Sequence, residues 1–232
     1  MRELLVAELG TVPYAEALEL QRAAARARIS GELAEDLLIL LEHPPVVTLG
    51  RTAKAANLIA TPALLAARGV EVFEVERGGD ITFHGPGQLV GYPIFDLKRH
   101  KQDLHWYLRQ VEEALIVALA SLGIPAERNE GKTGVWTRGR KIASIGVHAR
   151  DWVTWHGFAL NVNTDLSYFD LIVPCGIPDV TMTSVARELG VTAADESVVR
   201  GAVARAFGEV FGLAPRPAAA GELSLATTVR QE

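Results

Sequence analysis

The run from Arg77 to Gln88, RGGDITFHGPGQ, gathers four glycines, a proline, an arginine, an aspartate and a histidine into twelve positions. Glycine at this density opposes a helix or a regular strand, and it lets the backbone approach a ligand or another segment closely. The spacing fits neither the phosphate-binding G-x-x-x-x-G-K-[ST] loop nor the dinucleotide fingerprint. Two interpretations remain. The run is either a crossing point of two strands, with Arg77 paired to Asp80, or the wall of a ligand site, which its polarity favours.

Cys175 is the only cysteine of the chain and stands between Pro174 and Gly176, with Pro178 shortly after. A lone cysteine is usually a buried and inert side chain. A nucleophilic cysteine instead needs access and a positive neighbour that favours the thiolate. The two prolines restrict the local backbone, and no regular element is expected to cover the sulfur. The sequence leaves both interpretations open, the inert thiol and the nucleophile.

Lys141 begins the segment KIASIG and follows Arg138 and Arg140, so the local sequence is basic. Alternation along a strand would normally turn such a lysine toward solvent in a hairpin. Lysine can also supply a point charge and a proton acceptor inside a site. The distance in sequence does not tell whether Lys141 meets Cys175.

The six histidines form no i, i+4 pair on an expected helix and have no cysteine partner at zinc spacing. No metal site is therefore expected. His84 is the histidine for which a functional role is expected, because it lies inside the glycine-rich run. The others are expected to be packing or surface residues: His43, His100, His105, His148 and His156.

The elements that must position these residues follow from apolar periodicity, which predicts a mixed α/β order. Single strands are expected at residues 2–9, 36–42, 46–49, 70–76 and 89–97. Antiparallel hairpins are expected over 134–163, where bulky and β-branched residues are separated by turn-like segments. Helices are expected at 13–29, with Pro13 in the first turn, at 61–69, from Asp103 to Leu122, and at 196–211 with Gly212 as cap.

The composition indicates one folded domain, since 49% of the 232 residues are apolar and 22% are charged. We expect a single catalytic domain over 1–214, with a small C-terminal subdomain from about residue 180, and a tail over 215–232. The net charge of −5 disfavours a general nucleic-acid binder. No apolar run reaches membrane-span length, and the N-terminus lacks a signal-peptide pattern. With a single cysteine there is no disulfide framework, and a soluble, cytoplasmic protein is expected.

Four blocks in matching order resemble the lipoyl(octanoyl) transferases, also known as the lipoate-protein ligase B family. They are LEHPPVVTLGR (41–51), RGGDITFHGPGQLVGYPIFDL (77–97), GRKIASIGVHARDWVTWHGFALNVN (139–163) and FDLIVPCGIPD (169–179). The resemblance covers roughly residues 40–185. It implies an α/β (α+β) catalytic domain like that of biotin and lipoate protein ligases, with a mixed, largely antiparallel sheet flanked by helices.

The resemblance also implies an activity and its partners. The enzyme would transfer an octanoyl or lipoyl group from acyl-carrier protein to a lysine side chain on a lipoyl domain, in protein lipoylation. The implied acceptors are the lipoyl domains of 2-oxoacid dehydrogenases and the glycine cleavage H protein. Neither a cofactor nor a metal is expected, and neither a nucleic acid nor a membrane is an expected partner.

By the same resemblance, Cys175 and Lys141 are the catalytic dyad, with an acyl-thioester on Cys175. This transfer needs no ATP, because the donor and the enzyme thioester have similar energies. Lys141 would favour the thiolate and then accept a proton, and amides at Gly176 or around His84 and Gly85 are candidate oxyanion donors. The substrate-binding residues implied are Arg77, Gly78, Gly79, Asp80, Ile81, Thr82, Phe83, His84, Ser144, Ile145, Gly146, Gly157, Phe158 and Ala159.

Two other functions compete with this one. An ATP-dependent lipoate or biotin ligase of the same fold would share the glycine-rich wall and the strand lysine, but has no need of a cysteine at position 175. A non-catalytic acyl- or lipoyl-domain-binding module could lose either Cys175 or Lys141, and both are present. For docking of an acidic carrier protein, Arg138, Arg140, Lys141 and Arg150 are expected to form a basic patch.

Overall fold

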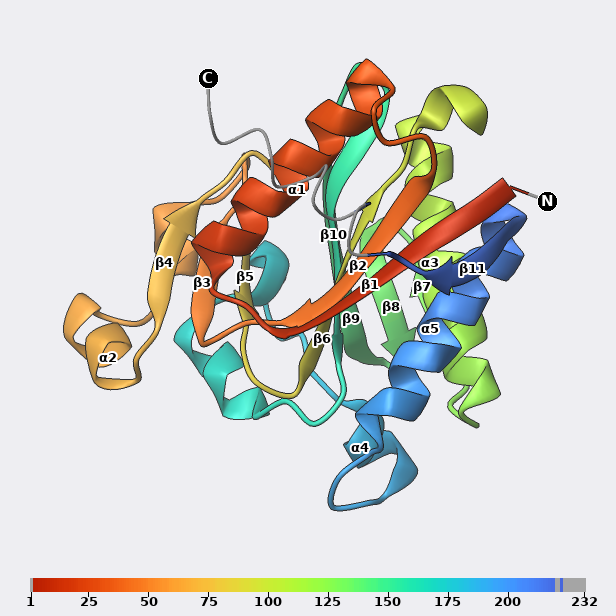
Figure 1. Ribbon diagram of the computed structural model, residues 1–232. Helices are drawn as coiled ribbons and strands as arrows, with labels where there is room; N and C mark the ends of the chain where they lie inside the picture. The colour runs from red at the N-terminus through yellow and green to blue at the C-terminus, as the bar shows by residue number, and fades with distance from the viewer. Residues whose placement is uncertain (1, 220–221, 223–232) are drawn as a thin grey trace.

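The computed structural model describes residues 2–219 and 222, and its centre is an eight-stranded sheet in the order β11-β1-β2-β6-β10-β9-β8-β7 (Figure 1). β1 runs parallel to β11 and β2, and all other neighbours are antiparallel. This confirms the expected mixed, largely antiparallel sheet. The strands are β1 (Arg2–Thr11), β2 (Asp36–Glu42), β6 (Gln88–Ile94), β7 (Glu127–Asn129), β8 (Lys132–Thr137), β9 (Arg140–Arg150), β10 (Val153–Asn161) and β11 (Leu213–Pro217).

A second, three-stranded sheet, β4-β3-β5, lies beside the first at the left of Figure 1. Its strands are β3 (Val46–Leu49), β4 (Glu71–Glu74) and β5 (Ile81–His84). β5 lies inside the glycine-rich run, so the expectation of an irregular run is wrong for these four residues. The reason is local, because Ile, Thr and Phe favour a strand and the glycines stand only on either side of them.

α1 (Tyr14–Ser30) covers one face of the large sheet, and α3 (Leu104–Ser121) and α5 (Glu196–Phe211) cover the other (Figure 1). The two short helices lie outside these layers: α2 (Pro62–Ala67) beside the small sheet and α4 (Val185–Leu189) before α5. The Asp103 side chain accepts a hydrogen bond from the amide of Trp106 at 3.0 Å and so caps α3. α5 ends at Gly212, whose φ of 66° is left-handed, as the sequence predicts. Pro13 precedes α1 as its cap and is not part of the first turn.

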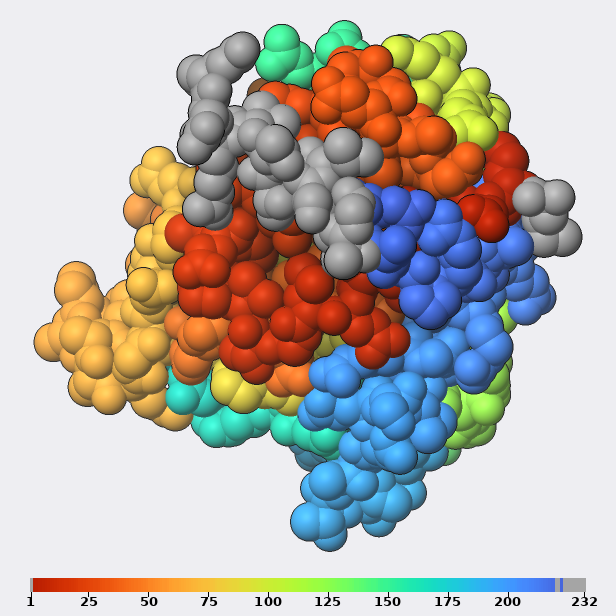
Figure 2. Space-filling view, in the orientation of Figure 1, coloured from red at the N-terminus to blue at the C-terminus, as the bar shows by residue number. Residues whose placement is uncertain are grey.

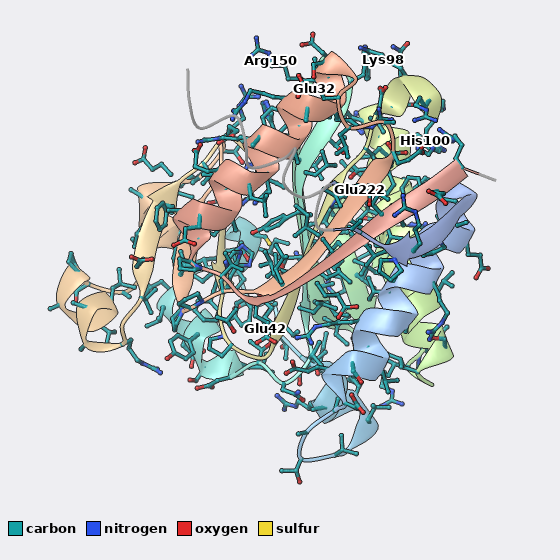
Figure 3. The ribbon with its side chains drawn as sticks, viewed as in Figure 1. Glu32, Glu42, Lys98, His100, Arg150 and Glu222 are labelled. Atoms are coloured by element: carbon teal, nitrogen blue, oxygen red, sulfur yellow. The ribbon has the colours of Figure 1, made fainter. Side chains whose placement is uncertain are left out.

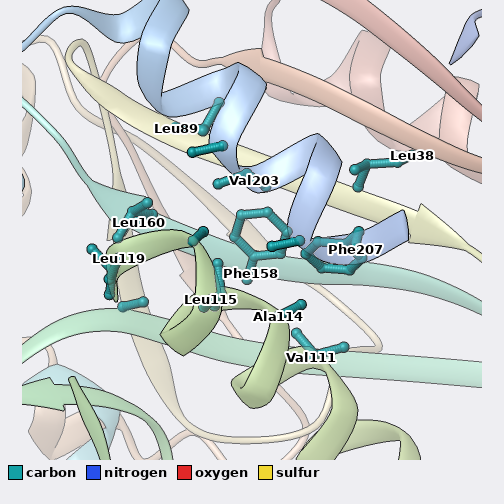
Figure 4. Packing of buried hydrophobic residues seen from close by; sticks show 14 of the residues in the cluster. Leu38, Leu89, Val111, Ala114, Leu115, Leu119, Phe158, Leu160, Val203 and Phe207 are labelled. Atoms are coloured by element: carbon teal, nitrogen blue, oxygen red, sulfur yellow. The ribbon is translucent and has the colours of Figure 1, made fainter. Parts of the chain in front are cut away.

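The pleat of β2 divides the core between the two faces of the sheet. Leu38 and Leu40 face the cluster beneath α3 and α5, whereas Leu37 and Ile39 face α1. Figure 4 shows side chains of α3 and α5 packed around Phe158 of β10. α5 therefore packs into the same core cluster as α3 and one face of the sheet.

The C-terminal strand β11 runs across the domain boundary expected at residue 214. It pairs in parallel with β1, from Arg2 with Leu213 to Val6 with Pro217. Most of the expected tail beyond it, at 220–221 and 223–232, lies outside the described residues. Figure 2 shows α1 and β1 across one face, with the segments around α2 and α4 projecting at its edges. Within 2–219 and 222, no helix has the length and apolarity to cross a membrane.

Candidate active site

Cys175 lies in a single turn of 3-10 helix, Pro174–Gly176, and its half-buried side chain borders a cavity. Its φ of 56° and ψ of 19° are left-handed, a conformation that costs a residue other than glycine of the order of 1–3 kcal/mol. The following Gly176 is left-handed as well, with a φ of 63°. The sequence suggests the Gly176 amide as an oxyanion donor. In the structure this amide already donates to the carbonyl of Val173 at 2.9 Å, so it is not free for that role.

Lys141 is fully buried, so the expectation of a solvated hairpin lysine is wrong. Its Nζ donates to Cys175 Sγ at 3.1 Å and to the carbonyl oxygen of Thr133 at 3.3 Å. The burial has a clear cause, because residues 181–183 lie along the start of β9. The Lys141 amide donates to Thr181, and the Thr183 amide donates to the Lys141 carbonyl. The structure thus joins two residues that are 34 positions apart in sequence.

The cavity beside Cys175 has a volume of about 260 Å³. Most of the substrate segments expected from the sequence line it: Arg77, Gly79, Asp80, Thr82, His84, Ser144, Ile145, Gly146, Gly157, Phe158 and Ala159. Ile81 and Phe83 do not, because alternation along β5 turns them into an apolar cluster on the opposite side. Gly78 does not either, since its amide donates to the Val147 carbonyl at 2.8 Å.

Two glycines permit the close backbone approach that shapes this cavity. A Cβ on Gly146 would lie 2.9 Å from the carbonyl oxygen of Gly78, where the glycine-rich run crosses β9. A Cβ on Gly157 would clash with the carbonyl oxygen of Gly91 on the neighbouring β6. The glycine-rich run therefore fits both interpretations of the sequence, because it crosses another strand and also forms part of the cavity wall.

Arg77 brings a buried positive charge to the cavity. Its guanidinium donates to Thr48 Oγ1, to the Thr48 carbonyl at 2.7 Å and to the Gly78 carbonyl at 3.1 Å. Within the described chain it has no ion pair with Asp80, whose carboxylate instead accepts from Asn57 Nδ2 at 2.6 Å. Burial lowers the pKa of Arg77, yet a guanidinium keeps its charge in proteins.

Sequence reasoning missed part of the cavity wall: Tyr14, Val90, Tyr92, Gly131, Lys132, Thr133, His156 and Ile177. His156 had been expected to be a packing or surface residue. It has a left-handed φ of 56° within β10, and its amide donates to Gln21 Oε1 at 3.0 Å. Burial lowers the pKa of His156. The sequence signal for it was weak, a histidine directly before a strand glycine.

Two more histidines form a buried polar cluster beside the cavity. His84 Nδ1 lies 2.8 Å from Gln88 Oε1, and His43 contacts the Val12 carbonyl at 2.7 Å and the Tyr92 hydroxyl at 2.6 Å. Because each Nδ1 faces an acceptor, we assign the proton of each neutral ring to Nδ1. Burial lowers the pKa of His43 to about 4 and that of His84 to about 3.

We expect the fold to lose stability in mild acid because of these two histidines. The unfolded chain takes up protons below pH 6.5, while His43 and His84 stay neutral in the folded state. The unfolded state therefore binds more protons than the folded state in mild acid. The free energy of unfolding is thus highest above pH 6.5 and falls as the pH falls toward 4. Between pH 6.5 and 5 the loss is about 1.6 kcal/mol per histidine, measurable by urea unfolding.

His84→Gln tests this expectation, since it removes one of the two contributions. The difference in unfolding free energy between pH 6.5 and 5 should become smaller than in the unmodified protein. His105→Gln is the control, because His105 is exposed on α3. An equal acid loss in His84→Gln and the unmodified protein contradicts the assignment.

The basic patch expected for carrier-protein docking does not form. Lys141 is buried, and Arg138 and Arg140 bind Glu188 at 3.4 and 2.9 Å. Arg150 lies at the other end of β9, near the end of α1 in Figure 3. Among residues 2–219 and 222, no three His, Cys, Asp or Glu side chains gather in a way that could hold a metal ion.

Comparison with known proteins places this site in context. Residues 13–208 match the family described as lipoyl protein ligase A/B catalytic domain. The octanoyltransferase of Koribacter versatilis is 53% identical over 211 residues, covering 89% of this chain and 83% of the relative. The octanoyltransferase of Gloeobacter violaceus is 48% identical over 219 residues, covering 94% and 95%.

Solved structures show the same fold at low sequence identity. A lipoate-protein ligase A bound with ATP superimposes with a TM-score of 0.76 at 19% identity, covering 98% of this chain and 93% of that chain. The biotin protein ligase of Aquifex aeolicus, in complex with biotin and ATP, gives a TM-score of 0.52 at 13% identity, covering 91% and 71%. These likenesses confirm the expected ligase-like fold.

Proposed function

The chain belongs to the lipoyl protein ligase A/B catalytic domain family, and we propose that it transfers an octanoyl group from a thioester donor to a lysine amine by way of Cys175. The observation that carries the proposal is the contact of 3.1 Å between Lys141 Nζ and Cys175 Sγ beside the cavity. A cavity of about 260 Å³ is small, since sites for drug-sized ligands span roughly 300–1,000 Å³. That size suits one unbranched acyl chain.

The donor in this proposal is octanoyl-acyl-carrier protein. The acceptors are lipoyl domains of 2-oxoacid dehydrogenases and of the glycine cleavage H protein. Similarity to octanoyltransferases at about half identity supports the acyl group. A cytoplasmic location belongs to the same proposal, because a nucleophilic thiol must stay reduced and the cytosol keeps thiols reduced.

In the first step the Cys175 thiolate attacks the carbonyl carbon of the donor thioester. The new carbon–sulfur bond forms as the bond to the donor sulfur breaks, and the donor leaves as a thiolate. The Lys141 ammonium gives this thiolate a proton and becomes a neutral amine. One thioester replaces another, so the step consumes no ATP.

In the second step the neutral amine of the acceptor lysine attacks the acyl-Cys175 carbonyl. The carbon–nitrogen bond forms, the bond to Cys175 Sγ breaks, and the proton lost by the amine passes to Lys141. The products are an amide, a thiolate and an ammonium, so the Cys175–Lys141 pair returns to its starting charges. Lys141 is buried against Cys175, so it needs no movement through solvent to serve both steps.

The competing function is an ATP-dependent lipoate or biotin ligase, which would activate a free acid as its adenylate. The two ligases of similar structure described above share only 19% and 13% sequence identity with this chain, so they support the fold alone. An adenylating ligase gives no reason for a lysine ammonium to contact a cysteine in its cavity. The contact between Lys141 and Cys175 therefore favours transfer through a thioester.

We expect the protein to take up one octanoyl group when it is mixed with octanoyl-acyl-carrier protein in the absence of ATP. Intact-mass spectrometry measures the adduct, and hydroxylamine should remove it because it cleaves thioesters. Addition of an apo lipoyl domain should then discharge the adduct and acylate the domain.

The control is octanoic acid with ATP and magnesium, which should give no acylated lipoyl domain. Transfer that depends on ATP, or an unmodified protein that takes up no acyl group from the carrier, contradicts the proposal and favours the ligase.

A further inference from the structure

Glu112 is a fully buried carboxylate on α3 that has no place in the steps above. Glutamate is almost never fully buried unless it is paired, because desolvation of the charge is costly. It does not line the cavity. Its position on the apolar face of α3, beside Val111 and Leu115, therefore calls for a reason.

The two oxygens of Glu112 face different groups. Oε2 accepts from Arg109 Nη1 at 2.6 Å and from Arg128 Nε at 3.2 Å, at the outer side of the helix. Oε1 accepts from the backbone amide of Gly134 on β8 at 3.1 Å. The two arginines compensate the charge of the carboxylate. The other oxygen, Oε1, accepts only the backbone amide of Gly134.

That amide belongs to the peptide group that contacts the catalytic pair. The peptide between Thr133 and Gly134 donates its N–H to Glu112 and accepts at its C=O from Lys141 Nζ at 3.3 Å. A peptide group is planar, with its N–H and C=O on opposite sides. An acceptor that fixes the direction of the N–H therefore also fixes the direction of the carbonyl on which Lys141 rests.

The lack of a side chain at Gly134 lets Lys141 lie close to the Thr133–Gly134 peptide. The φ of Gly134 is 135°, and a Cβ there would lie 2.9 Å from Lys141 Cε and 3.3 Å from Nζ. The lysine side chain thus lies directly against this peptide. A carboxylate that accepts from the N–H also polarises the peptide and strengthens its carbonyl as an acceptor.

We propose that Glu112 is a positioning residue that, through the Thr133–Gly134 peptide, holds Lys141 Nζ against Cys175 Sγ. The inference deepens the proposed function and rests on it only through the Cys175–Lys141 pair. Glu112 would thus support the reaction from α3, a helix whose other buried residues pack the core.

Alkylation of Cys175 by iodoacetamide at pH 7 tests this role without any substrate, since the chain has a single cysteine. Alkylation follows the thiolate, which a correctly placed ammonium favours. Glu112→Ala should slow it about tenfold, within the range that small misplacements cost. Glu112→Gln, which keeps an acceptor for the Gly134 amide, should restore most of the rate.

Glu113→Ala is the matched control. Glu113 is adjacent and binds the same Arg128, at 2.6 Å, but its carboxylate is partly exposed and has no bond to Gly134. It should leave the alkylation rate unchanged. If Glu112→Ala does not fold, Glu112→Leu removes the acceptor while filling the space, and it should show the same loss.

The decisive comparison is made in Lys141→Met. If Glu112 acts through Lys141, Glu112→Ala should cause no further slowing in that background. Additive losses, or an equal loss in Glu113→Ala, overturn the role. Octanoyl uptake is measured separately, so a protein that alkylates as expected but takes up no acyl group would refute the proposed function and leave this inference standing.

Discussion

Cys175→Ala should abolish octanoyl transfer, with turnover falling about 10⁴-fold or more, as removal of a catalytic nucleophile does in other acyl transfer enzymes. The protein would lose the only thiol of the chain and with it the site of the acyl adduct. Steady-state transfer to an apo lipoyl domain and intact-mass spectrometry measure the two losses.

The fold should survive this change. Cys175 is half-buried, and the contacts of its sulfur are Lys141 Nζ at 3.1 Å and Ser144 Oγ at 3.8 Å. Alanine accepts the same left-handed backbone no worse than cysteine. Urea unfolding should show a loss of about 1–3 kcal/mol, because the buried Lys141 Nζ keeps the Thr133 carbonyl as acceptor but loses the sulfur. A broad loss of folding would instead indicate that the cysteine is structural.

Cys175→Ser is the matched variant, because it keeps a hydroxyl acceptor for Lys141 in nearly the same volume. A serine has far weaker nucleophilicity without a dedicated base, so transfer should still be lost. Any adduct that it retains would be an ester, and would therefore react with hydroxylamine more slowly than a thioester. Wild-type turnover in Cys175→Ser contradicts the thioester route.

Local patterning predicted most of the elements that carry this site. Apolar spacing predicted α3 within a residue of its observed bounds, and Asp103 and Gly212 act as the expected caps. It also predicted the β9–β10 hairpin, whose turn falls at 151–152. These features depend on neighbours three to four residues apart or on one turn, and such information is local in sequence.

The burial of Lys141 could not be predicted in this way. Alternation assumes that one side of a strand end is open to water, but residues 181–183 cover the start of β9. His156 was missed for a similar reason, since its side chain borders the cavity through a left-handed kink in β10 that periodicity does not encode. Glu112 contradicts the helical pattern outright, as a charge on the buried face of α3. Each of these failures occurs where distant segments meet.

The charges around the cavity explain why these particular residues need long-range support. Lys141 and Arg77 are buried cations, and neither has a carboxylate within ion-pair distance in the described part of the chain. Two cations without an ion-pair partner favour a further anion in the cavity, beside the Asp80 carboxylate. In the proposed reaction, the thiolate of Cys175 would supply that anion before transfer, and the oxyanion of a tetrahedral intermediate would supply it during transfer.

Lys141→Met should lower octanoyl transfer by about 10²–10⁴-fold, the range that general acid–base catalysis contributes. Methionine nearly matches the lysine stem and removes a buried charge, so stability should be unchanged or higher. Single-turnover experiments separate the two steps. Enzyme acylation in Lys141→Met should recover as the pH rises, because hydroxide can form the thiolate without the ammonium.

Transfer of the acyl group from Lys141→Met to the lipoyl domain should stay slow even at higher pH, unlike acylation of the enzyme. Methionine cannot accept the proton that the attacking amine loses. Lys141→Arg should not rescue this step. A guanidinium keeps its proton throughout the accessible pH range, and its planar head would press on the Gly134 backbone that already lies against Lys141. Discharge at the unmodified rate in Lys141→Arg would show that position 141 supplies only charge, and would remove Lys141 from the second step while leaving its role beside the thiolate.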